Sequence, residues 1–114
     1  MDKEVEKNVH ETKGVVKVFR TYLGKVENKE IIKIRRFKTD TATVGMHLER
    51  KVNLEDLGYK YESLQVAVWI TMPCYVEEAK EVYKEISVEI KNLVDKEIEE
   101  VKQNIRSNNT FAAY

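Results

Sequence analysis

The sequence predicts a single α+β domain in which a four-stranded antiparallel sheet packs one long C-terminal helix on one face. Apolar and polar residues alternate over four segments in the first two thirds of the chain, as in strands with one buried face. In the last third, apolar residues recur every three or four positions, which is the period of a helix. The length of 114 residues fits one domain.

The four strands are expected after a polar segment, residues 1–13, which has no period and is predicted to be a flexible tail. The domain proper is expected to span residues 14–106. A turn at residues 27–29 would join the first two strands as a hairpin. Pro73 is expected to end the fourth strand, because proline cannot donate a hydrogen bond to a sheet. The predicted strands cover residues 15–26, 30–38, 43–52 and 62–72.

The helix is predicted over residues 75–106, and residues 107–114 are assigned to a C-terminal tail. A helix of this size is about 45 Å long, whereas a compact domain has a radius of gyration of about 13 Å. The end of its apolar stripe would then overhang the sheet. We expect a second copy of the chain to cover it, as a homodimer; a bent helix or docking of residues 107–114 are the alternatives. The stripe is Ala79, Val82, Tyr83, Ile86, Ile90, Leu93, Val94, Ile98, Val101 and Ile105.

Charge is distributed unevenly along a chain that is neutral as a whole. Residues 14–60 hold eleven basic and six acidic side chains, a net charge of +5. Residues 74–106 hold six basic and nine acidic side chains, a net charge of −3. This asymmetry suggests a surface for a polyanion. The alternative is that the two halves neutralise each other, within one molecule or across a dimer.

The strand residues that point away from the helix are the candidate for such a surface. Single-stranded nucleic acid is bound by cations that follow the phosphates and by aromatic rings that stack on bases. If the alternation holds in every strand, this face includes Lys17, Phe19, Lys33, Arg35, Phe37, His47, Lys51, Gln65 and Trp69. The predicted nucleic-acid site is Lys17, Lys33, Arg35, Arg36, Phe37, Lys38, Arg50, Lys51 and Trp69. The same aromatic residues would also suit a protein interface or a second small core.

No motif predicts catalysis, a cofactor, a metal or a small-molecule substrate. The four glycines are isolated, and the two histidines and one cysteine do not form a metal-binding pattern. Cys74 is expected to be a small buried residue at the start of the helix. No apolar run is long enough to cross a membrane, so a cytoplasmic protein is expected. The charged fraction of 35% fits a hyperthermophile's protein, or a long solvated helix that needs Lys and Glu.

Residues 60–86, KYESLQVAVWITMPCYVEEAKEVYKEI, combine a strand, a proline and a helix rich in Glu and Lys. This segment, together with the Lys, Glu, Ile and Val bias of the whole chain, resembles small proteins encoded by rod-shaped crenarchaeal viruses, the rudiviruses. The resemblance implies a virus-encoded protein in a hot host cytoplasm, where DNA handling or host takeover is the common role. It brings no catalytic residues. The predicted function is non-enzymatic nucleic-acid binding, with single-stranded DNA as a candidate ligand. The alternative is a protein–protein interaction module that targets a host or viral partner.

Overall fold

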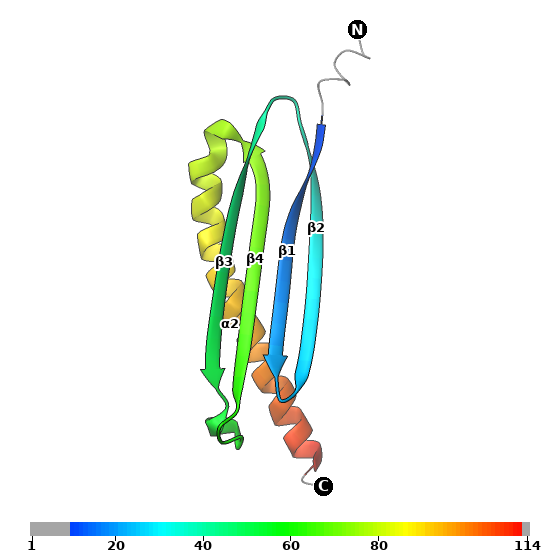
Figure 1. The fold of residues 1–114 in the computed structure, drawn as a ribbon, viewed down its shortest axis with the longest axis vertical. Helices are drawn as coiled ribbons and strands as arrows, with labels where there is room; N and C mark the ends of the chain where they lie inside the picture. The colour runs from blue at the N-terminus through cyan, green and yellow to red at the C-terminus, as the bar shows by residue number, and fades with distance from the viewer. Residues whose placement is uncertain (1–9, 113–114) are drawn as a thin grey trace.

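A computed structural model describes residues 10–112, with side chains from 11 to 107. Four antiparallel strands form one sheet in the order β2-β1-β4-β3, and a long helix, α2, packs on one face of it (Figure 1). The predicted class, a four-stranded antiparallel sheet with one C-terminal helix, is confirmed. The elements are β1 (His10–Tyr22), β2 (Lys25–Phe37), β3 (Thr41–Asn53), β4 (Ser63–Tyr75) and α2 (Ala79–Ala112), with short 3-10 helices η1 (Glu55–Leu57) and η2 (Val76–Glu78).

The hairpin of β1 and β2 turns at Leu23-Gly24, four residues before the turn that the sequence predicted. Both turn residues have positive φ, 47° and 76°, the backbone that matches the twist of a two-residue hairpin. Tyr22 therefore pairs with Lys25, and even-numbered residues of β1 lie opposite odd-numbered residues of β2. The predicted turn is wrong, and the error places every β2 side chain on the face opposite to the one expected.

The molecule is elongated, with a radius of gyration of 19.3 Å. Strands of 13 residues are about 43 Å long, and a helix of 34 residues is about 51 Å long. The two layers therefore match in length. Val101 and Ile105 are buried in the same core as Leu54, at the end of β3. The expected overhang is absent for these residues, so it no longer argues for a dimer.

The helix covers one half of the sheet, because α2 packs on β3 and β4 and crosses toward the turn end of the first hairpin (Figure 1). Even-numbered residues of β1, β3 and β4 face α2 and form the core with its apolar stripe. Tyr83 departs from the predicted stripe, since its side chain is exposed. Within residues 10–112, no helix or strand covers the opposite side of the sheet, which we call the open face.

Both predicted ends of the domain, and the end of the fourth strand, differ from the structure. Pro73 lies inside β4, where the strand pairs with β3 but is beyond its last pair with β1, Val15–Thr71. A strand with one neighbour tolerates proline. Residues 10–13, expected in the N-terminal tail, belong to β1, and residues 107–112 continue α2. The rest of both tails lies outside the described residues.

Candidate interaction surface

Four of the ten described strand cations form ion pairs with acids of α2 or η2. Arg20, on β1, is buried and lies 2.9 Å from Glu97 and 3.2 Å from Glu100. Lys29, on β2, lies 2.8 Å from the same Glu97. Further strand–helix ion pairs join Arg35 to Glu78 and Arg50 to Asp95. For these residues, the uneven charge of the sequence serves to join the two layers of one molecule.

Arg20 and Glu97 are the two buried charged residues between positions 11 and 107. Burial alone would lower the pKa of Arg20, but its hydrogen bond to Glu100 and the charges of Glu27 and Glu97 outweigh it and raise that pKa above its ordinary value. Arg20 therefore stays charged. This network anchors the C-terminal half of α2 to the turn end of the first hairpin, whereas residues 30–36 of β2 stay exposed.

The nine residues of the predicted nucleic-acid site do not form one surface. Phe37 is fully buried, with its ring 5.0 Å from that of Tyr75 and 4.8 Å from the Arg35 guanidinium, so it cannot stack on a base. The physical reason is the two-residue turn, which directs odd-numbered residues of β2 to the helix side. Lys17, Arg36, Lys51 and Trp69 lie on the open face; Lys33, Arg35, Phe37 and Arg50 lie on the helix side; Lys38 lies in the connection after β2.

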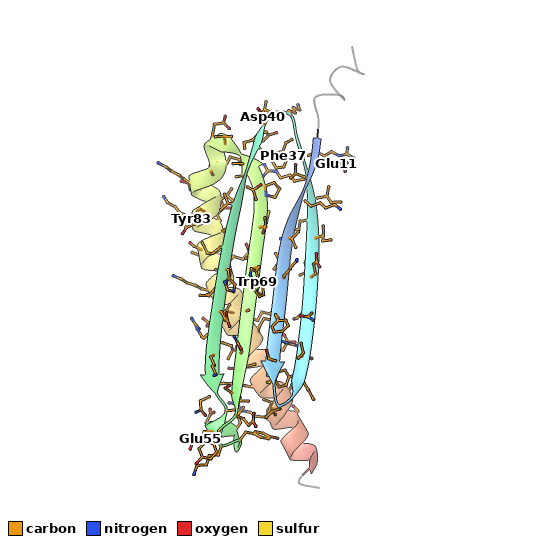
Figure 2. All side chains as sticks on the ribbon, in the orientation of Figure 1. Glu11, Phe37, Asp40, Glu55, Trp69 and Tyr83 are labelled. Carbon is orange, nitrogen blue, oxygen red and sulfur yellow. The ribbon has the colours of Figure 1, made fainter. Side chains whose placement is uncertain are left out.

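A row of four side chains crosses the middle of the open face. Glu30, Lys17, Trp69 and His47 are direct partners across β2, β1, β4 and β3. Trp69, labelled in Figure 2, is 40% exposed, and its ring stacks on His47 with centroids 4.6 Å apart. An open hollow of about 490 Å³ beside it is lined by Val15, Lys17 and Glu30. Lys17, the cross-strand partner of Trp69, thus lies opposite a carboxylate.

The open face as a whole is close to neutral. Arg36 is 3.1 Å from Glu11, and Lys51 lies two residues along β3 from Glu49, on the same face. Among the described side chains, four basic residues there (Lys13, Lys17, Arg36 and Lys51) meet three acidic ones (Glu11, Glu30 and Glu49), a net charge of +1. This is a weak field for a polyanion.

The outer part of β2 exposes apolar side chains on both faces of the sheet. Ile31 is 54% exposed on the helix side, while Ile32 and Ile34 are 52% and 61% exposed on the open face. β2 lies at the edge of the sheet, so its backbone is also unpaired on one side. We call residues 30–36 the isoleucine edge. Long apolar edge strands act as templates for a further strand.

The sequence itself indicates this edge, through apolar residues that break the strict alternation expected of a strand with one buried face. Residues 31, 32 and 34 are all isoleucine, so apolar side chains occupy both parities of the strand. Apolar residues at both parities are a feature of strands buried on both faces, and here they stand among four charged residues. The run thus indicates a cover that the single chain does not provide among residues 10–112.

Cys74 is fully buried, and burial raises the pKa of its thiol, as expected for a small core residue. No group of three or more His, Cys, Asp or Glu side chains within the described residues could hold a metal ion. In the same part of the chain, no helix is both long and apolar enough to cross a membrane.

Comparisons of the chain with protein-family models, curated proteins and solved structures gave no match.

Proposed function

We propose that the chain is a non-enzymatic protein-interaction module that binds its partner as an added strand along the isoleucine edge. The observation that carries this proposal is the exposure of Ile31, Ile32 and Ile34 on both faces of an unpaired edge strand. In strand addition, backbone hydrogen bonds supply affinity and alternate side chains supply specificity.

The backbone of β2 supports this mode of binding. In a two-residue hairpin, the pair beside the turn exchanges both hydrogen bonds, and here that pair is Tyr22–Lys25. Bonded pairs then alternate along the strands, so the odd-numbered residues of β2 bond to β1. The even-numbered residues, Ile32 and Ile34 among them, direct their N–H and C=O groups to the free edge. A partner strand would gain these bonds together with apolar contacts.

Nucleic-acid binding is the second candidate, and the stacked Trp69–His47 pair favours it, with Lys17 beside Trp69 and Lys51 on the same face. Its weakness is electrostatic, because Lys17 lies opposite Glu30 and the open face has little net charge. Phosphate contacts make affinity fall steeply with salt. We therefore expect no change in Trp69 fluorescence or oligonucleotide anisotropy at physiological salt. Salt-sensitive quenching by single strands would favour this candidate instead.

The proposal is tested by a photo-crosslinking amino acid at position 34, in cells that naturally make the protein. The matched control is position 88 on α2, because Val88 has the same exposed fraction as Ile34, 61%. We expect polypeptide adducts at position 34 and none at position 88. The absence of any polypeptide adduct at position 34 would contradict the proposal. With the crosslinking amino acid placed at position 69 instead, nucleotide adducts would support the second candidate.

A further inference from the structure

We infer that the strand that pairs with β2 is β2 of a second copy of the chain, antiparallel to it, with a twofold axis at Lys33. The two sheets would join into one sheet of eight strands, four from each copy. This inference rests on the proposed function, because it uses the same edge, and it names the partner.

Symmetry limits the registers that such a pair can adopt. Antiparallel edge strands are related by a twofold axis perpendicular to the sheet, and the two copies present the same patch to each other. The axis keeps each side chain on its own face in both copies. Even-numbered residues must then lie opposite even-numbered residues. The axis therefore passes midway between one residue and the same residue of the second copy, and we name the axis by that residue. The candidates near the middle of the exposed edge are Ile31, Ile32 and Lys33.

The open face of β2 is self-complementary when the axis is at Lys33. Residues 30, 32, 34 and 36 of this face read Glu, Ile, Ile and Arg. In reverse, the same residues read Arg, Ile, Ile and Glu. Ile32 therefore lies opposite the partner's Ile34, and Glu30 lies opposite the partner's Arg36, with both pairs repeated by symmetry. Apolar and opposite-charge pairs directly across strands are the ones that stabilise a sheet.

The other two candidate registers each bring like charges together twice. An axis at Ile31 would place Lys29 opposite the partner's Lys33, and it would place Glu30 opposite the partner's Ile32. An axis at Ile32 would place Lys29 opposite the partner's Arg35. The register at Lys33 has one like-charge contact, between the two Lys33 side chains. These lie on the helix side, where Lys33 is exposed and its long stem can carry the charge into water.

The helix layer leaves room for this pairing. α2 packs on β3 and β4, and its buried ion pairs reach β2 only as far as Lys29. On the helix side of the isoleucine edge, Ile31 and Lys33 are exposed, and no described residue covers them.

The first experiment is sedimentation over a protein concentration series for the wild type, Ile34→Lys and the matched surface variant Val88→Lys. We expect a wild-type dimer, a dissociation constant raised about tenfold or more by Ile34→Lys, and no change for Val88→Lys. Circular dichroism should show the same fold in all three, since both positions are exposed in the single chain. A monomer at every concentration, or a dimer that Ile34→Lys does not weaken, would overturn the inference.

The second experiment locates the axis with the single variants Ile31→Cys, Ile32→Cys and Lys33→Cys under mild oxidation. A disulfide needs Cβ atoms about 4 Å apart, so only the residue on the axis can bond to its own copy without strain. We expect Lys33→Cys to cross-link at least about tenfold faster than the other two. The wild type should not cross-link, because Cys74 is buried.

Faster cross-linking of Ile31→Cys or Ile32→Cys would overturn the register. If the purified protein is monomeric while position 34 captures a different polypeptide in cells, the proposed function stands and the second copy is the wrong partner. If position 34 captures no polypeptide, the proposed function itself fails.

Discussion

The two halves of the sheet have strands of the same length and pairing but opposite surroundings. In β4, the helix-side residues Leu64, Val66, Val68 and Ile70 are fully buried under α2. In β2, Phe37 is the single buried residue of thirteen. Three isoleucines in β2 thus contribute little to the core of the single chain. Under the proposed function, β4 serves the core of the single chain and β2 serves to bind a partner strand.

The two edge strands of the sheet, β2 and β3, differ in the side chains that they expose. On β3, consecutive exposed residues Glu49, Arg50 and Lys51 are all charged, and charges on an edge discourage further pairing. On β2, the isoleucine edge also holds four charged residues, but three exposed isoleucines lie among them. A second strand is therefore expected at β2 and disfavoured at β3.

The largest expected difference between the halves is in core stability. Ile90, on α2, is 1% exposed, and Ile90→Ala should lower the free energy of unfolding by about 3 kcal/mol through lost packing and a cavity. Ile34→Ala should change it by less than about 0.5 kcal/mol in the monomer, as at other surface positions. Urea denaturation at low protein concentration measures both. Equal costs would mean that the isoleucine edge is covered within the single chain.

A second comparison concerns how α2 is held to each half. Arg20→Met removes the main partner of the buried Glu97, though Lys29 remains, so a loss of about 2 kcal/mol is expected. Arg50→Met removes an ion pair with the exposed Asp95, on the β3 side, and should cost less than about 1 kcal/mol. Thermal or urea unfolding of the two variants gives the comparison. Similar losses would argue against a special anchor at the first hairpin.

A smaller effect is expected on the pH dependence of stability, from two buried groups of the core. Burial raises the pKa of Cys74 above its ordinary value of 9.0, so the folded state keeps a proton that the unfolded state releases. Stability should then fall as the pH rises above about 9. Tyr22, whose pKa is raised by burial and by its hydrogen bond to Glu27, adds to the fall at higher pH. In Cys74→Ala, the decline of unfolding free energy with pH should be shallower. An unchanged slope would contradict this assignment.

Much of the fold could be predicted, because alternation and helical period locate the strands and α2 directly. The nucleic-acid site could not be predicted correctly, and the misplaced turn between β1 and β2 explains most of the error. Glu27, Asn28 and Lys29 have turn-like composition, yet the chain turns at Leu23-Gly24. The position of the turn decides whether the odd- or the even-numbered residues of β2 face the helix. The shift of the turn therefore moved every β2 side chain to the opposite face of the sheet and buried Phe37. The overhang expected from a compact domain is absent, because the 13-residue strands match the helix in length and the molecule is elongated.

The most direct test of the account is amide hydrogen exchange along β2, resolved by residue, at several protein concentrations. Amides of Lys29, Ile31 and Lys33 face β1 and should be protected at every concentration. Amides of residues 30, 32, 34 and 36 face the free edge and should gain protection as the concentration rises. Those of Val26 and Asn28, outside the predicted pairing, should stay unprotected. Rapid exchange of the amides of residues 30, 32, 34 and 36 at every concentration would contradict the claim that a second copy pairs along this edge.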